Sequence, residues 1–216
     1  MTKEQKSILI SLFIGDGCLR RPNEGSVQAE IGHSIKQESY CLYKAKLLHS
    51  IIGGNMPNLK YRISSLNTET CRWVKTHRYF KTIRKWLYPN NKKTITRHLL
   101  DKLSPQGIAI WYMDDGWLAI RKNPSTGNPR SRHIGLGTYG FSYEEHLIMQ
   151  KYFDEVWNIR FSIIKYKKQF KLVAGSIEGT KFINLVKSYI LPEFKYKIDF
   201  KYSTRAQNSR DTDDIV

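Results

Sequence analysis

The sequence predicts an α/β (α+β) fold made of two repeats related by pseudo-two-fold symmetry, each in the order αββαββα. Two observations predict it. The apolar segments LISLFIGDG (9–17) and IAIWYMDDG (108–116) both end in Asp-Gly, and a similar series of strand-like and helix-like patterns follows each of them. We therefore expect a first repeat at 1–103, a second at 104–206, and a frayed polar tail at 207–216.

The first repeat should open with a helix over residues 3–17, because Thr2 and Gln5 match a capping box and apolar residues follow them. Apolar and polar side chains alternate from Val27 to Ile31, as in a strand with one buried face. The elements expected next are, in order, strands at 18–21 and 27–36, a helix at 40–52, strands at 59–66 and 70–77, and a helix at 78–87.

The second repeat should open with a helix over residues 105–116, where Ser104 is the N-cap and Pro105 the first helical residue. Ser142 and Glu145 match a second capping box. The remaining elements expected are strands at 117–122 and 132–139 around a Pro/Gly/Ser-rich loop at 123–131, a helix opening at 142, strands at 160–166 and 170–175, and a helix at 180–191 that stops at Pro192.

Positive charge dominates the composition, with 36 Lys and Arg against 19 Asp and Glu, or a formal net charge of +17 over 216 residues. Such an excess favours a polyanionic partner, and nucleic acid is the first candidate. No window approaches the roughly 20 apolar residues of a spanning helix, so no membrane partner is expected. The three cysteines, Cys18, Cys41 and Cys71, lack CxxC spacing, which disfavours a disulfide framework or a cysteine zinc site and fits a reducing compartment.

Asp16 and Asp115 each stand directly before the glycine that should end a motif helix. In the simplest interpretation they are polar residues at a helix end whose glycine supplies a left-handed cap. A helix C-terminus already has a partial negative charge, however. Two such ends side by side would create a strongly negative electrostatic potential unless a bound cation neutralised it. Oxygen-only ligands favour a hard ion such as Mg²⁺, with Mn²⁺ as a substitute, and carboxylates that hold Mg²⁺ beside a phosphodiester are typical of metal-assisted nucleases.

The two motif segments resemble the signature helices of double-motif LAGLIDADG homing endonucleases, and the resemblance covers nearly the whole chain. It implies that the two motif helices pack together at the pseudo-dyad and that antiparallel β saddles lie on DNA. It also implies that Asp16 and Asp115 bind divalent metal at the scissile phosphates, helped by the backbone carbonyls of Gly15 and Asp114.

Two basic segments resemble the family in position, NNKKTI (90–95) near the end of the first repeat and PEFKYKI (192–198) near the end of the second. They imply Lys93 and Lys197 as a basic catalytic residue near each active site, which would position the attacking water or stabilise charge on the phosphate. The alternative is that each lysine is a solvated residue of a basic protein. Polar candidates to complete the sites are Gln28 and His33 in the first repeat and Tyr166 or Lys167 in the second.

Basic, polar and aromatic residues on or near the predicted strands should form a surface for duplex DNA, because a two-stranded ribbon fits the major groove. For any single residue a solvated strand face is the competing interpretation. The expected DNA contacts are Arg20, Arg21, Gln28, His33, Lys36, Arg62, Arg72, Lys75, Arg121, Arg132, Tyr139, Lys165, Lys167 and Lys171.

Together, the residues and the resemblance predict a monomeric, site-specific endonuclease that makes a staggered double-strand break in a long asymmetric DNA target by metal-dependent phosphodiester hydrolysis. It would spread the intron or reading frame that encodes it. Two alternatives stay open, a maturase that binds structured intron RNA and a cleavage-inactive DNA-binding protein of the same fold. The protein should reside where its target DNA is, in a bacterial or phage-related cytoplasm or an organelle matrix, and not be secreted.

Overall fold

The computed structural model describes residues 1–63, 67–127 and 129–199. It divides the chain into two compact units. Unit 1 holds residues 1–94 and 102–107, and unit 2 holds residues 95–101 and the chain from Ile108 onward. The repeat boundary proposed from the sequence falls within the segment 102–107. The predicted tail at 207–216 lies outside the described residues.

Unit 1 has the predicted order of elements, and its strands form one antiparallel sheet in the order β1-β2-β4-β3. The elements are α1 (Lys3–Ile14), β1 (Cys18–Arg20), β2 (Gln28–Ser34), α2 (Glu38–Ile52), β3 (Lys60–Ile63), β4 (Glu69–Thr76) and α3 (Arg78–Leu87), with a short 3-10 turn at Ile35–Gln37. The capping box at Thr2 and Gln5 is formed as predicted.

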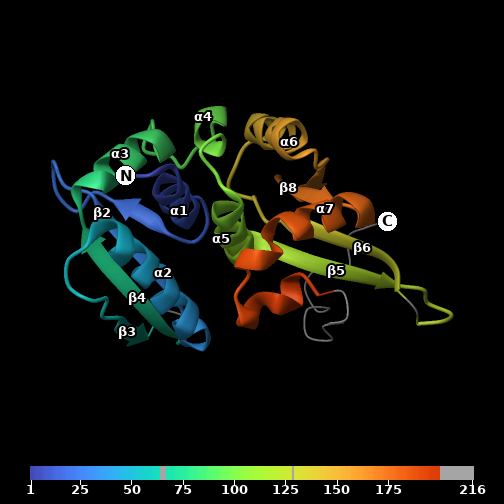
Figure 1. Ribbon diagram of the computed structural model, residues 1–216, viewed down its shortest axis with the longest axis horizontal. Coiled ribbons are helices and arrows are strands. Elements are labelled where there is room, and N and C mark those ends of the chain that lie inside the picture. The colour runs from blue at the N-terminus through green and yellow to red at the C-terminus, as the bar shows by residue number, and fades with distance from the viewer. Residues whose placement is uncertain (64–66, 128, 200–216) are drawn as a thin grey trace. The chain divides into compact units, whose positions relative to one another are not determined.

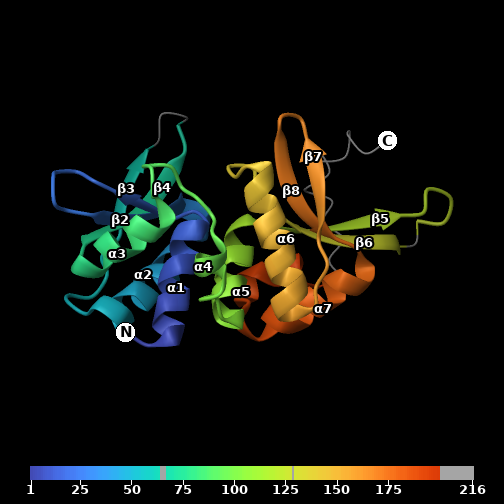
Figure 2. The same cartoon turned by 90° about the horizontal axis from the view of Figure 1, so that it is seen from above.

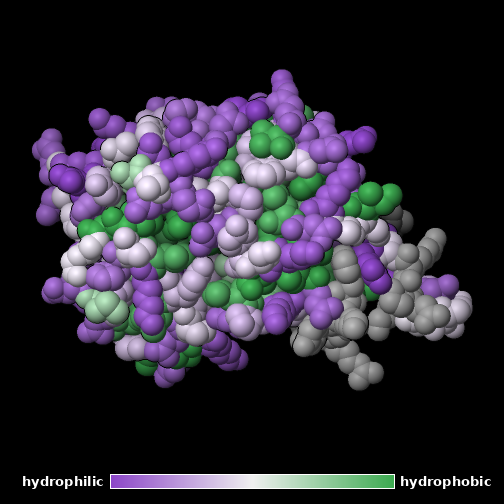
Figure 3. Space-filling model, viewed as in Figure 1, coloured by the Kyte–Doolittle hydropathy of each residue, from purple (hydrophilic) through white to green (hydrophobic). Residues whose placement is uncertain are grey.

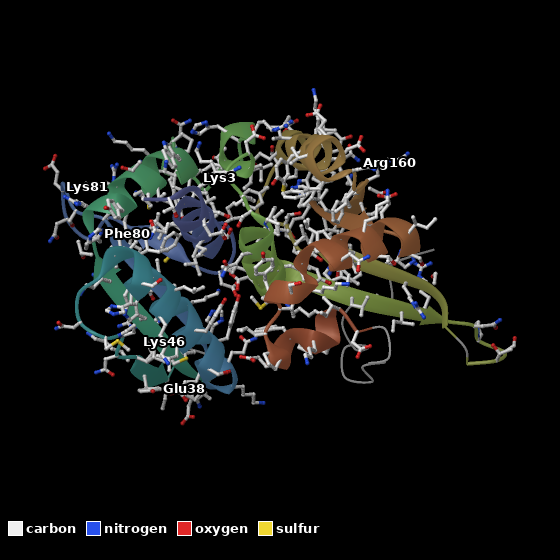
Figure 4. All side chains as sticks on the ribbon, viewed as in Figure 1. Lys3, Glu38, Lys46, Phe80, Lys81 and Arg160 are labelled. Carbon is white, nitrogen blue, oxygen red and sulfur yellow. The ribbon has the colours of Figure 1, made fainter. Side chains whose placement is uncertain are left out.

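One face of this sheet is buried beneath helices. Alternate residues of β2, namely Ala29, Ile31 and His33, are buried, and α2 packs on β2 and β4 (Figures 1 and 2). α3 adds Phe80, whose ring lies edge-on to Phe13 of α1 at 5.8 Å, whereas the next residue, Lys81, is exposed (Figure 4). The opposite face of the sheet, called the uncovered face below, carries Arg20, Gln28, Glu30, Arg62 and Arg72 among other residues.

Unit 2 repeats this order after one extra short helix, α4, and its sheet has the equivalent strand order β5-β6-β8-β7, again antiparallel. Its elements are α4 (Arg97–Leu100), α5 (Pro105–Asp115, which starts in unit 1), β5 (Gly116–Lys122), β6 (Pro129–Leu136), α6 (Tyr143–Trp157), β7 (Ser162–Tyr166), β8 (Gln169–Ala174) and α7 (Ser176–Val186). α6 packs on β7 and β8, and α7 packs on β6 and β8. The Ser142–Glu145 capping box is formed as predicted.

The prediction for the last helix was wrong at both ends. α7 starts at Ser176 and ends at Val186, and Pro192 opens a 3-10 segment, Pro192–Lys197, instead of only stopping a helix. Glycine weakens a helix, so the local pattern favoured a later start. In the folded unit Gly179 is buried against β6, where an added Cβ would lie 3.3 Å from Ile134, so close packing outweighs the low helix propensity.

Hydrophilic side chains cover most of the face seen in Figure 3, as the charge of the chain leads one to expect. None of the helices in the described residues combines the length and the apolar character needed to cross a membrane.

Candidate functional site

Asp16 lies in a turn that folds tightly back on the end of α1. The helix ends at Ile14, and Gly17, the glycine expected to supply a left-handed cap, does not have a positive φ, so that interpretation was wrong. The N–H of Gly17 donates to the carbonyl of Leu12 at 3.0 Å, and a Cβ at Gly17 would lie 2.2 Å from that oxygen. Glycine is needed here for close backbone approach, which leaves Asp16 beside the helix end.

Asp115 is instead the last residue of α5, and Gly116 starts β5 directly. A Cβ at Gly116 would lie 2.1 Å from Cδ2 of Tyr112 and 2.3 Å from its carbonyl oxygen. Burial raises the pKa of Tyr112, so its phenol stays protonated, and its single proton is shared between the carbonyl oxygens of Lys197 at 2.8 Å and Trp117 at 3.1 Å. The same ring that excludes a side chain at Gly116 therefore ties the motif helix to Lys197.

Each of the two lysines predicted from the basic segments reaches the backbone beside the aspartate of its own unit. Lys93 Nζ donates to the carbonyls of Ile14, Gly15 and Gly17 at 3.2, 2.8 and 3.2 Å. Lys197 is buried, and its Nζ donates to the carbonyls of Met113 at 2.7 Å and Asp114 at 3.5 Å. A cation at the C-terminal end of a helix is stabilising, and here it also holds the peptide that precedes each aspartate.

His33 lies next to Asp16 in unit 1, and Lys44 lies on the far side of His33. His33 Nδ1 is 3.8 Å from the Asp16 carboxylate, and Lys44 Nζ is 3.1 Å from His33 Nε2. Lys44 is fully buried over the Tyr40 ring, 4.5 Å from its centroid. Lys44 therefore lies on the Nε2 side of the His33 ring, and the Asp16 carboxylate lies on the Nδ1 side at a distance longer than a hydrogen bond.

Asp115 is held differently, by a residue of its own helix. Trp111 Nε1 donates to Asp115 Oδ2 at 3.0 Å, one helical turn apart. Trp111 is fully buried, stacked near Phe153 of α6, so the indole N–H is fixed in position. The two motif aspartates thus have different supporting residues, although the lysine contacts beside them match.

The strand registers divide the predicted DNA contacts of unit 1 between the two faces of the sheet. Gly32 pairs with Arg72, Ser34 with Thr70 and Arg62 with Thr70, so these residues share the uncovered face. Arg20 and Gln28 pair with each other on the same face. An open hollow of about 380 Å³ on this face is lined by Asp16, Cys18, Arg20, Glu30, Gly32, His33, Ser34, Arg62, Thr70, Cys71 and Arg72.

Other predicted contacts of unit 1 lie away from that uncovered face. Lys75 alternates to the helix-covered side, where a Cβ at Gly54 would lie 3.3 Å from its Nζ. His33 also belongs to the covered side and is buried, although it reaches the edge of the hollow beside Asp16. Arg21 follows β1 and Lys36 lies in the 3-10 turn, and both are exposed.

The strand registers of unit 2 divide its residues between two faces of the sheet in the same way. Trp117 pairs with Gly135 and Arg121 with Ser131 on the uncovered face, and β7 and β8 add Tyr166 and Lys171 there. Arg132 and Lys165 alternate to the other side of the sheet. Lys167 has φ 55° in the tight turn between β7 and β8, and Tyr139 follows β6 with its ring 5.9 Å from that of Tyr166.

Sequence reasoning missed three residues of these sites. The pair Trp111 and Asp115 has i, i+4 helical spacing, a signal that could have been used. Lys44 in α2 and Glu30 in β2 gave no such signal in the sequence, because the residues that they contact belong to other helices and strands.

The donor set of each unit fits a hard divalent cation. Each supplies one motif carboxylate and a neighbouring backbone carbonyl, of Gly15 or Asp114, and the Asp16 side chain is 44% exposed at the hollow. Oxygen donors of this kind suit Mg²⁺ or Mn²⁺ and not a thiolate-seeking metal.

Comparisons with known proteins identify the family of the chain. A model described as the LAGLIDADG DNA endonuclease family matches residues 6–182. Probable intron-encoded endonuclease 1 of Wickerhamomyces canadensis is 25% identical over 206 residues, which cover 93% of this chain and 86% of the relative. Cytochrome b mRNA maturase bI2 of Debaryomyces hansenii is 24% identical over 207 residues, 92% of this chain and 74% of the relative.

Structural similarity supports the fold. The solved structure of the homing endonuclease I-WcaI bound to its DNA recognition sequence has a TM-score of 0.74 at 24% identity, over 92% of this chain and 87% of that one. The predicted fold class is therefore confirmed. Mycobacterial RecA proteins also match, and the chain spans about half of their length, 47% for that of Mycolicibacterium flavescens.

Proposed function

The chain belongs to the LAGLIDADG DNA endonuclease family, and from this premise we propose that it is a homing endonuclease that makes a staggered double-strand break in a long, asymmetric DNA duplex. The observation that carries this proposal is the matched pair of sites, each with a motif aspartate whose preceding peptide is held by a lysine from the end of its own unit. One chain holds both sites, so we propose that it acts as a monomer, in whatever compartment contains its target DNA.

We propose that Asp16 and Asp115 hold the divalent ions, with the carbonyls of Gly15 and Asp114 as further ligands. A carbonyl oxygen has two lone pairs, so it can accept from a lysine and still face a cation. Mg²⁺ or Mn²⁺, when bound, would neutralise charge on the scissile phosphate and lower the pKa of water. The protein itself would keep each carboxylate in place, through His33 and Lys44 in unit 1 and through Trp111 in unit 2.

The lysines give this proposal a test specific to one DNA strand. Lys93→Met should slow cleavage of one strand about 10²-fold and Lys197→Met cleavage of the other, because each removes a cation that acts in one unit only. Labelling the two strands separately would measure the rates. Lys187→Met is the matched control, because Lys187 is an exposed lysine in the 3-10 turn Lys187–Tyr189 that follows α7, and it should leave both rates unchanged. Equal slowing of both strands by either variant would contradict the assignment of one lysine to one cut.

Duplex binding should depend steeply on salt, because the uncovered faces carry arginines and lysines that would neutralise phosphates. If about ten phosphates are contacted, affinity should fall by several decades between about 50 and 200 mM salt. Fluorescence anisotropy on a fixed duplex, in EDTA to prevent cleavage, measures this. A nearly flat salt dependence would contradict binding through these faces.

The target itself can be found by cleavage selection on a randomised duplex library with Mg²⁺, comparing wild type with Asp115→Asn. Recovery of one long, non-palindromic site cut only by the wild type would support the endonuclease. Tight, salt-sensitive binding without a cut product would favour a cleavage-inactive DNA-binding protein.

A second candidate function is assistance of intron splicing, which the similarity to the Debaryomyces hansenii maturase favours. The partner would then be structured intron RNA. Absence of both cutting and site-selective duplex binding, together with tight binding to a folded intron transcript, would make this the better proposal.

A further inference from the structure

A carboxylate stands between two arginines on the uncovered face of the unit 1 sheet. Glu30 Oε2 is 3.0 Å from Arg20 Nε, and Glu30 Oε1 is 3.6 Å from Arg72 Nη1. The side chain of Glu30 is only 12% exposed, whereas those of Arg20 and Arg72 are 62% and 33% exposed. All three line the hollow that also contains Asp16.

This carboxylate works against general affinity for DNA. It reduces the positive potential of a face proposed to contact phosphates, in a chain that otherwise carries a net +17. Arginines that only neutralised phosphate would bind more tightly without it. What Glu30 supplies is orientation, because its carboxylate attracts one nitrogen of the Arg20 guanidinium at 3.0 Å and, more weakly, one nitrogen of the Arg72 guanidinium at 3.6 Å.

The contact with Arg20 uses Nε, which leaves the Nη1 and Nη2 pair of that guanidinium as a fork. Such a fork matches the O6 and N7 acceptors of guanine in the major groove, and a carboxylate beside it matches the N4 amino group of cytosine. Oriented arginines with a carboxylate between them therefore have the chemistry to read G·C pairs.

The equivalent place in unit 2 has different chemistry. In unit 1, Cys18 lies two residues after Asp16 and pairs with Glu30. In unit 2, Trp117 lies two residues after Asp115 and pairs with Gly135. A Cβ at Gly135 would lie 2.4 Å from the Trp117 ring, so no glutamate fits there. Lys171 Nζ lies 5.2 Å from the centroid of that ring and 5.0 Å from that of Tyr166.

We propose that Arg20, Glu30 and Arg72 form a guanine-reading cluster for the half-site bound by unit 1, at the base pairs nearest the phosphate that Asp16 approaches. The cluster made by Trp117, Tyr166 and Lys171 does not require guanine in the other half-site. The inference rests on the proposed function, since it assumes that the uncovered face of unit 1 meets duplex DNA.

The test is a binding selection on a randomised duplex in EDTA, comparing wild type with Glu30→Gln. Wild type should select guanine at adjacent positions of one half-site by about 10- to 100-fold over other bases. Glu30→Gln should bind mixed duplex several-fold more tightly while that preference falls at least about 10-fold. An unchanged preference would overturn the inference, as would a wild type that selects no guanine there.

Two controls separate orientation from charge and from folding. Glu69→Gln removes a solvent-exposed carboxylate of the same sheet whose side chain lies on the opposite face from Glu30. This variant should leave the guanine preference intact. Arg20→Lys keeps the charge and loses the fork, so it should weaken the guanine preference without tightening the binding of mixed duplex. If Glu30→Gln fails to fold, the result for Arg20→Lys tests the inference in its place. The selection needs no cleavage, so its outcome is separate from that of the proposed function. A protein that selects guanine but does not cut would support this inference and contradict the endonuclease proposal. A protein that cuts but does not select guanine would support the endonuclease proposal and overturn this inference.

Discussion

Asp115→Asn is expected to abolish double-strand cleavage while leaving duplex binding nearly intact, and Asp16→Asn should do the same. Asparagine keeps the size of the side chain and one oxygen, so Trp111 Nε1 can still donate to residue 115. It loses the negative charge that a hard divalent ion requires. We expect the rate on one strand to fall at least about 10³-fold, the upper range for removing one strong electrostatic contact to a transition state.

The measurement uses a supercoiled plasmid and a duplex labelled separately on each strand, with binding followed in EDTA. Each single variant should at most nick the plasmid, on opposite strands, and never linearise it at the wild-type rate. Asp154→Asn, at an exposed aspartate of α6, is the control and should cut like the wild type. A variant at 16 or 115 that still cuts at the wild-type rate would remove that residue from the chemistry.

Gly116→Ala is expected to lower the free energy of unfolding by about 3 kcal/mol or more, among the largest effects of a single methyl group. Its Cβ would lie 2.3 Å from the carbonyl oxygen of Tyr112, a backbone atom that cannot move without distorting α5. Gly17→Ala should have a similar effect, because its Cβ would lie 2.2 Å from the carbonyl oxygen of Leu12.

Urea unfolding followed by tryptophan fluorescence and circular dichroism would measure the loss. Gly140→Ala is the matched control, since a Cβ there meets nothing within 4 Å, and it should be neutral or slightly stabilising. A Gly116→Ala protein as stable as the wild type would contradict the close approach at the end of α5. The same result would also question how Asp115 is positioned.

Much of the fold could be predicted because it is encoded locally. The order αββαββα followed from apolar periodicity, and both capping boxes depend on residues three apart. Lys93 and Lys197 were predicted from their matched positions near the end of each repeat, and both reach the peptides beside Asp16 and Asp115. These features depend on neighbours in the chain or on repetition, which a sequence displays directly.

Other features depended on contacts that no local pattern contains. The start of α7 was placed too late because Gly179 is a poor helix former whose packing on Ile134 cannot be read from its neighbours. Lys75 and Arg132 were assigned to the DNA-facing surface from charge alone, whereas strand register places them on the other side of their sheets.

The sequence by itself determined the family and the order of the elements, and it predicted the residues that we propose for metal-dependent hydrolysis. The tertiary structure alone decided which side chains support that chemistry. Lys44 behind His33, and Glu30 between Arg20 and Arg72, are juxtapositions made by sheet register and helix packing. Local patterns determine which elements form, but the partners of a side chain depend on which distant elements pack beside it, because burial and electrostatic contact act through space and not along the chain.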